Sequence, residues 1–411
     1  MIFITGKDIT DRILGLMSLI GLMMLPGCSS DDTDEPTSAT NLPIEVMSGV
    51  SDFEDAALLQ DTRGGNTSLT RAWKLPNNYS LDKEDKSISI VFTQNGMDAL
   101  DAAAKKKLQG KFFKSSGHWR TTVDITEAGP YYLYGYMPDI VGVDYTISKP
   151  TGDGEDYGDG AVMVLDKLPT VTSEDLCVVV GAKNGKDDYQ ADADYPVTGL
   201  QRGSFDYAAS TTTGEGSGGN YVYLLFDHLY AALRLKFRVK EKYNDLRTIK
   251  IKEMTLKTVD ESDDSDGSDD SDGSKKDQLT KATITLTKTT DGTDPIVSVD
   301  FDPSNKGGYG NILTSKDGIE LTNEYKTFMS YFMPNGITKL VLTTVYDVYD
   351  KQGNLIRPDC KARNTFNLGK LITYFDSVQR GTRYTFYLTI NPTYLYQLSE
   401  PDLDTPTVVL E

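Results

Sequence analysis

The chain carries few of the side chains that serve as nucleophiles, metal ligands or proton shuttles. Its 411 residues include 3 Cys and 2 His, at Cys28, Cys177, Cys360, His118 and His228. Thiol, imidazole and zinc chemistry needs several such groups gathered at one place. These five are spread along most of the chain, so we expect no enzyme activity, no cofactor and no metal site.

Neither histidine has a catalytic partner in its local sequence. His118 lies between Gly117 and Trp119, and Asp227 directly precedes His228. A triad requires a histidine beside both a nucleophile and a carboxylate. Neighbours on a strand point to opposite faces, so Asp227 is not expected to orient His228.

Cys177 and Cys360 are too far apart in sequence to indicate a disulfide framework. We expect both to be small, buried, apolar residues.

An acidic repeat resembles a calcium loop without completing one. The hexapeptide Asp-Asp-Ser-Asp-Gly-Ser occurs at 263–268 and again at 269–274. In EF-hand register, Ser262 takes the first position and Gly273 the twelfth, where a bidentate Glu is required. We expect 260–274 to be a disordered hairpin tip between strands 249–256 and 282–286, with weak calcium association as the alternative.

A glycine-rich segment also matches a motif by letters only. Gly214–Gly219 fits the dinucleotide fingerprint, but it precedes a Tyr/Val-rich strand instead of joining a strand to a helix. We therefore expect no nucleotide site there.

The N-terminal segment predicts export. Lys7 and Arg12 precede an apolar run at 13–24, which has the length of a signal-peptide core and is too short to span a bilayer. We expect residues 1–27 to be a signal peptide. Leu25-Pro-Gly-Cys28 resembles a bacterial lipobox, which implies a lipidated (palmitate-bearing) Cys28 and a linker at 28–43. The alternative is an ordinary secretory signal with an incidental Cys.

Charge and composition narrow the class of protein. There are 61 acidic and 42 basic residues, a net charge of −19, which disfavours binding to nucleic acid. With 38% hydrophobic and 25% charged residues the composition is that of a soluble globular protein. At roughly 150 residues per domain, the length favours two or three domains.

Short runs with a period of two recur along the chain and predict an all-β sandwich fold. The expected strands are 44–46, 87–92, 131–137, 176–180, 221–226, 233–239, 249–256, 282–286, 296–301, 340–348 and 383–390. One segment predicts a short helix, 96–109, with Asn95 as N-cap and Gly110 as the stop. A Gly/Ser/Thr-rich break at 208–220 places a boundary between an N-terminal domain at 44–213 and a C-terminal domain at 214–411.

Several strings, in order along the chain, resemble the fimbrillins of Bacteroidetes, the FimA/Mfa-like pilins. Besides the lipobox, they are Ile44–Val50, 69–73, 129–138, 226–237, 246–252 and 389–396. The acidic residues after Cys28 also look like the surface-export tether of Bacteroidetes lipoproteins. The resemblance implies two transthyretin-like β-sandwich domains in tandem, with the helix in the first, assembled into a fimbria without enzyme activity.

The resemblance also implies a processing route. In this family a lipidated precursor reaches the outer membrane, and an arginine-specific protease cuts after the first strand, which here is Ile44–Val50. The candidate site is Arg71-Ala72, with Arg63-Gly64 as the alternative. The alternative outcome is an uncut chain.

Loss of the first strand would leave a groove for a donor strand from a neighbouring subunit. The candidate donor is the tail at 393–411, whose last apolar residues are Thr407, Val408, Val409 and Leu410. The alternative is that this tail forms the final strand of its own C-terminal domain.

The expected partners are other fimbrial subunits, as a homo- or hetero-polymer, with the outer membrane reached through the lipid anchor. Host or bacterial surface receptors are further candidates, and the roles of shaft, anchor and tip subunit stay open. A rival interpretation is a surface glycan-binding lipoprotein. It would stack sugars on Tyr131, Tyr132, Trp119 or Trp73.

Overall fold

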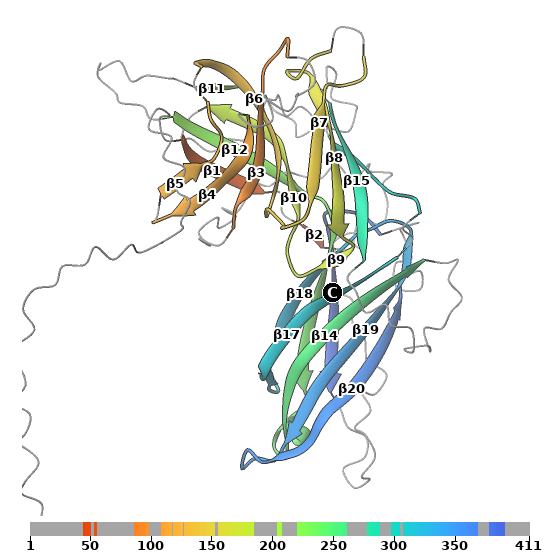
Figure 1. Ribbon diagram of the computed structural model, residues 1–411. Helices are drawn as coiled ribbons and strands as arrows, with labels where there is room; N and C mark the ends of the chain where they lie inside the picture. The colour runs from red at the N-terminus through yellow and green to blue at the C-terminus, as the bar shows by residue number, and fades with distance from the viewer. Residues whose placement is uncertain are drawn as a thin grey trace, which may run out of the picture. The chain divides into compact units, whose positions relative to one another are not determined.

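Each of the eleven strands that the alternating pattern predicts between residues 44 and 390 is present in the computed structural model (Figure 1). The structure describes residues 44–50, 53–55, 86–97, 108–116, 118–125, 127–152, 155–184, 204–207, 220–260, 278–287, 297–304, 307–368 and 378–390. These residues are almost entirely strands, with one four-residue helix, α2 (Glu241–Asn244). The predicted all-β fold class is therefore confirmed.

The largest sheet has eight strands in the order β1-β12-β10-β6-β3-β4-β5, with β11 paired to β6. Its strands are β1 (Ile44–Val50), β3 (Ile88–Thr93), β4 (Gln109–Ser115), β5 (His118–Thr121), β6 (Gly129–Met137), β10 (Cys177–Asn184), β11 (Phe205–Tyr207) and β12 (Asn220–His228). All pairings are antiparallel except that of β1 with β12, which is parallel.

A four-stranded sheet packs against one face of the eight-stranded sheet. Its order is β16-β15-β8-β7, and its strands are β7 (Asp144–Ser148), β8 (Gly160–Pro169), β15 (Leu279–Thr287) and β16 (Val297–Phe301). Tyr134 and Val178 from the larger sheet and Met163 and Ile284 from the smaller one belong to a single buried apolar cluster. The two sheets thus form a β-sandwich.

A second pair of sheets shares another core. One sheet has the order β2-β21-β13-β18-β9 and the other the order β17-β14-β19-β20. The strands are β2 (Glu54–Asp55), β9 (Val171–Thr172), β13 (Ala231–Val239), β14 (Thr248–Asp260), β17 (Gly308–Leu321), β18 (Lys326–Phe332), β19 (Ile337–Tyr349), β20 (Leu355–Asn367) and β21 (Thr382–Ile390). Leu235 and Phe386 of the first sheet share a cluster with Leu256 and Leu342 of the second.

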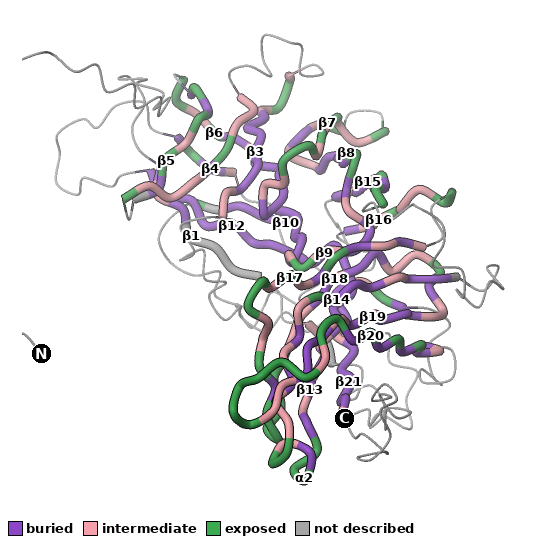
Figure 2. Tube along the Cα trace, turned by 60° about the horizontal axis from the view of Figure 1, so that its bottom comes forward, coloured by how far each residue is buried: buried purple, intermediate pink, exposed green. Residues whose placement is uncertain are grey.

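The central strands of the eight-stranded sheet are buried on both faces. In β10, Cys177 and Val179 enter one apolar cluster, whereas Val178 and Val180 enter the other. A strand covered on both faces needs a continuous apolar run instead of an alternating one, and 176–180 is such a run. Figure 2 shows β10 and β12 as largely buried along their length.

Strand pairing crosses the boundary that the sequence predicts between residues 213 and 214. β12 lies beyond that boundary yet pairs with β10, and β15 pairs with β8. In the other direction β9 pairs with β18. The division at 213/214 stays a prediction, and composition near a linker gives no information on these long-range pairings.

One connection predicted from the sequence is wrong. The strands on either side of 260–274 do not form a hairpin, because β14 pairs with β17 and β19 while β15 pairs with β8 and β16. The segment connects strands of different sheets because each strand finds its partner elsewhere in the chain. Asp260 ends β14, and the acidic repeat at 263–274 lies outside the described residues.

The central residues of the predicted helix, 98–107, also lie outside the described residues, so this helix stays a prediction. At its ends, Gly96 is in a turn and Gln109 already belongs to β4. Across the described residues, no helix is both long enough and apolar enough to cross a membrane.

Candidate functional site

The first strand is inserted at the end of the eight-stranded sheet. β1 runs parallel to β12 over its whole length, from Ile44 opposite Asn220 to Val50 opposite Phe226. Ile44 and Val46 are 2% and 4% exposed and belong to the same apolar cluster as Val222. β1 therefore supplies both backbone hydrogen bonds and core side chains to a strand that lies far from it in sequence.

The same N-terminal segment continues to a second sheet. After β1, Phe53 contacts aromatic rings, and β2 pairs in parallel with Thr382 and Arg383 of β21. β1 thus pairs with the edge of β12, and β2 with the edge of β21. Neither attachment is a hairpin, because both partner strands come much later in the chain.

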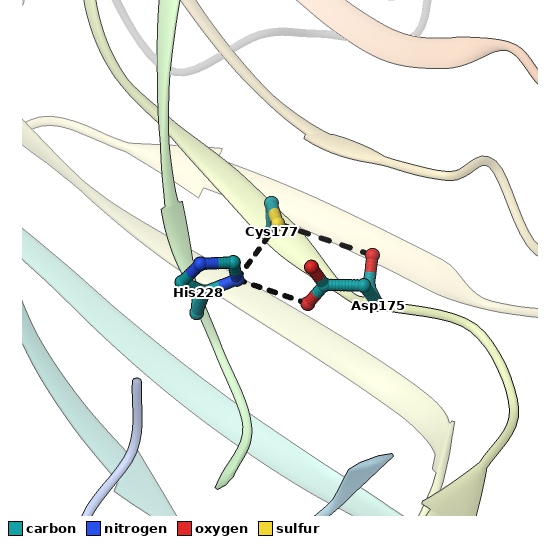
Figure 3. A group of neighbouring side chains, drawn as sticks. All are labelled: Asp175, Cys177 and His228. Carbon is teal, nitrogen blue, oxygen red and sulfur yellow. Dashed lines mark hydrogen bonds and ion pairs between the residues drawn. The ribbon is translucent and has the colours of Figure 1, made fainter. Parts of the chain in front are cut away.

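Phe53 covers a buried polar cluster. Its ring stacks on the imidazole of His228, with 3.5 Å between the ring centroids and 21° between the ring planes. The ring of Tyr331 is tilted relative to that of Phe53, and their centroids are 5.9 Å apart. Beneath it, the Nδ1 atom of His228 lies 3.0 Å from Oδ1 of Asp175 and 3.5 Å from Sγ of Cys177. Figure 3 shows the three side chains pointing toward one another.

The strands position this cluster directly. Cys177 begins β10, His228 ends β12, and the two residues are opposite each other in the antiparallel pair. Asp175 precedes Cys177 by two residues, a spacing that directs both side chains to one face of extended chain. All three are buried, with exposures of 7% for Asp175, 0% for Cys177 and 2% for His228.

The electrostatics keep Cys177 protonated. Burial raises the pKa of the Cys177 thiol well above its usual value, and the charges of Asp175 and Asp227 raise the pKa further. A neutral thiol is a poor nucleophile. In a catalytic relay, the nucleophile and the carboxylate contact different nitrogens of the imidazole, whereas here both contact Nδ1. The cluster is therefore not arranged for nucleophilic catalysis.

Beside the cluster, the buried Asp227 forms an ion pair with the partly buried Arg380. Nη1 of Arg380 donates to Oδ2 of Asp227 at 2.6 Å and to the backbone oxygen of His228 at 2.8 Å. Its Nη2 donates to the backbone oxygen of Val297. The guanidinium group thus links the end of β12 to the start of β16 and to the chain leading into β21. Asp227 thus contacts Arg380, whereas the imidazole of its neighbour His228 contacts Asp175.

The predicted processing and assembly residues lie outside the described residues. They are Cys28, Arg63, Gly64, Arg71, Ala72, Thr407, Val408, Val409 and Leu410. Their roles, together with the C-terminal tail 393–411, stay predictions. Within the described chain, Cys177 and Cys360 are both buried and not disulfide-bonded, which confirms their expected character.

The rival sugar platform is partly wrong. Tyr131 and Trp119 are 3% and 6% exposed, and both rings lie in the apolar cluster beneath the eight-stranded sheet. Large rings fill this core because they bury much apolar area each, so neither ring is exposed to stack on a sugar. Tyr132 is partly exposed, and Trp73 lies outside the described residues.

Sequence reasoning missed Asp175 and Phe53. The available signal for Asp175 was its spacing of two from Cys177 in Asp-Leu-Cys, which puts both on one face. No local pattern indicates that β10 and β12 are neighbours in the register that brings His228 opposite Cys177. The position of Phe53 likewise depends on tertiary contacts.

No family model and no curated protein matches the chain. Several solved structures are similar to it. A candidate cell adhesion protein from Bacteroides fragilis has 11% identity and a TM-score of 0.35, covering 86% of this chain and 94% of that one. A fimbrial protein from Bacteroides vulgatus has 12% identity and a TM-score of 0.30, with 84% and 94% covered. A fimbrial protein from Bacteroides ovatus has 10% identity and a TM-score of 0.27, with 85% and 48% covered.

Proposed function

We propose that the chain is a structural subunit of a cell-surface fimbria that assembles by strand exchange and supports adhesion. The observation that carries this proposal is the parallel insertion of β1 beside β12, with Ile44 and Val46 in the core. Because β1 is not tied to β12 by a hairpin, a strand from another chain can take its place without altering the path of the remaining chain.

Removal of β1 would create a site with two complementary parts. The edge of β12 would lose its partner for backbone hydrogen bonding, and the core would lose two apolar side chains. Full burial of an Ile and a Val contributes about 3–6 kcal/mol. An unpaired edge beside an apolar slot is the acceptor used in β-strand addition.

The proposed processing route supplies the removal. Arg71 and the alternative Arg63 lie between β2 and β3 in sequence, so cleavage at either would separate β1 and β2 from the rest of the chain. Before that cut, the exported precursor is held at the outer membrane through lipid on Cys28. The subunit's partners are further copies or other fimbrial subunits, and its fibre displays surfaces for host or bacterial receptors.

The proposed donor is the tail 393–411 of a neighbouring subunit. Val408 and Leu410 are two residues apart in sequence, as are Ile44 and Val46, so one face of an extended donor would present two apolar side chains to the slot.

The test compares cleavage with assembly. The protein is isolated from its native envelope, its N-terminus is determined by mass spectrometry, and its size is measured by chromatography and electron microscopy. The parent is compared with Arg71→Lys and Arg63→Lys, which keep the charge but remove the arginine. We expect polymers that begin at Ala72 or Gly64, and an uncut monomer in the variant that blocks the cut. Polymers built from chains that retain residues 44–55 would contradict the proposal.

A truncation separates the donor from the acceptor. Deletion of 405–411 leaves β1, β12 and all described strands in place. We expect a folded, cleavable monomer that does not polymerise. Fibres of normal length from this truncation would contradict the assignment of 393–411 as the donor strand. They would not contradict the proposed cleavage.

A further inference from the structure

The cluster of Asp175, Cys177 and His228 has the composition of a metal site. It offers one carboxylate oxygen, one sulfur and one imidazole nitrogen, and all three donor atoms lie within 4.8 Å of one another. We propose that these three residues bind a zinc ion that fastens β10 to β12 beneath the N-terminal segment. This inference does not depend on the proposed fimbrial function.

The distances suit a single small cation. Zinc binds sulfur at about 2.3 Å and nitrogen or oxygen at about 2.0–2.2 Å, so donors on one tetrahedral ion lie roughly 3.3–3.7 Å apart. The separation of 3.5 Å between Sγ of Cys177 and Nδ1 of His228 is already in this range. The separation of 3.0 Å between Nδ1 and Oδ1 of Asp175 requires a shift of a few tenths of an ångström. Sγ of Cys177 and the carboxylate of Asp175 lie within 4.8 Å of each other, so binding draws this pair together by up to about 1 Å.

The donor set favours zinc among the common divalent cations. Calcium and magnesium prefer oxygen ligands, whereas a mixture of thiolate, imidazole and carboxylate suits zinc. Three protein ligands leave the fourth tetrahedral position for a water molecule.

A divalent cation would also interact with the three donor atoms more favourably than a single proton on Nδ1 of His228 does. Nδ1 of His228 carries at most one proton, yet it contacts both the carboxylate and the sulfur. A divalent ion placed among the three donors would interact with all of them at once and stabilise the thiolate.

The scaffold is ordered before any ion arrives. Cys177 pairs with Met137 of β6 on one side and with His228 of β12 on the other, so it lies on a central strand. Phe53 covers one face of the imidazole. Ligands held beside paired strands lose little freedom upon binding, which favours affinity.

Cobalt is the probe, because a cobalt–thiolate bond has a distinctive near-ultraviolet charge-transfer band and tetrahedral cobalt has a strong visible spectrum. The purified full chain carrying Cys28→Ser is unfolded in denaturant that contains a chelator and is then refolded. The refolded protein is titrated first with cobalt and then with zinc. Metal is also supplied during refolding, since the site is buried. We expect one equivalent of cobalt per chain, the thiolate band, displacement by zinc, and a higher melting temperature with zinc.

Matched variants locate the site. Cys360→Ser removes the other buried cysteine, which lies on β20, and is expected to behave as the parent. Cys177→Ser is expected to lose the thiolate band and at least tenfold in affinity. If Cys177→Ser does not fold, Asp175→Asn provides the same comparison, with an altered visible spectrum and weaker binding. A folded parent that takes up no cobalt by either route, or a band that persists in Cys177→Ser, would overturn the proposal.

Discussion

The ring of Phe53 stacks on the imidazole of His228 with 3.5 Å between their centroids. This contact joins the N-terminal segment to a buried cluster that the rest of the chain builds. Phe53 follows β1 and directly precedes β2, so it lies between the two strands that pair with β12 and β21. Residues 44–50 and 53–55 are therefore attached at three points to parts of the chain that come much later in sequence.

The first prediction concerns this stack. Replacing Phe53 with Ala removes an aromatic pair, which is worth about 0.5–1.5 kcal/mol beyond the buried area. We expect a lower free energy of unfolding in urea, with a smaller loss in Phe53→Leu, which keeps apolar volume. Equal stabilities for the parent and both variants would show that the stack does not hold the segment.

The second prediction concerns how much β1 contributes to the stability of the eight-stranded sheet. Val46 is 4% exposed in the core, whereas its neighbour Glu45 is only partly buried. Val46→Ala should lower stability by about 1–3 kcal/mol through lost apolar contact and a cavity. Glu45→Ala is the control and should change stability by less than about 0.5 kcal/mol. Urea unfolding measures both, and equal losses would mean that β1 contributes little core energy.

The third prediction uses two buried tyrosines that contact each other. The hydroxyl of Tyr134 donates to the backbone oxygen of Tyr157, while the hydroxyl of Tyr157 is buried without a hydrogen-bond partner in the described part of the chain. A buried polar group without a partner is costly. Tyr157→Phe should therefore raise stability by about 1 kcal/mol, and Tyr134→Phe should lower it by about 1 kcal/mol. Thermal unfolding at matched concentration distinguishes the two signs.

The fourth prediction concerns alkaline pH. Burial raises the pKa of Tyr230 far above 10.0, and its hydroxyl donates to the backbone oxygen of Pro169 at 2.6 Å. Above pH 10 the unfolded chain releases this proton while the folded chain keeps it, so stability is fully present below that pH and falls as the pH rises. The slope for one such group is about 1.4 kcal/mol per pH unit.

Urea unfolding between pH 9 and 11.5 checks this slope. Burial also raises the pKa of Tyr145 and Tyr331, so the parent should lose stability steeply. Tyr230→Phe should be less stable at neutral pH because its hydrogen bond is gone, and its loss above pH 10 should be shallower by the contribution of one group. Parallel curves for the parent and the variant would contradict the assignment.

The fifth prediction concerns Arg380 and Asp227. Asp227 is 1% exposed, and Arg380 donates to it at 2.6 Å. Arg380→Met removes the cation and should cost about 3–5 kcal/mol, as for other buried ion pairs that lose one partner. The double variant Arg380→Met with Asp227→Leu should recover most of this loss, because it removes the buried charge as well. A double variant as unstable as the single one would indicate that packing, not charge, determines the effect.

The sequence alone was sufficient to predict the all-β class and the approximate positions of eleven strands, because side chains alternate across a strand and this local pattern needs no knowledge of the partner. It also predicted two buried cysteines without a disulfide, from their spacing. It did not predict the long strands β8, β17 and β20, nor short ones such as β5, β9 and β11, whose partners come from other parts of the chain.

Tertiary structure alone decided which strands are neighbours. Ile44 is recognisable as a strand residue from its surroundings in sequence, but its parallel position opposite Asn220 is not. The same holds for Cys177 and His228, which the sequence separates and the register of β10 and β12 brings together. Every residue type except proline offers the same backbone donor and acceptor, so local sequence specifies that a segment is a strand, and only the packing of the whole core selects its partner.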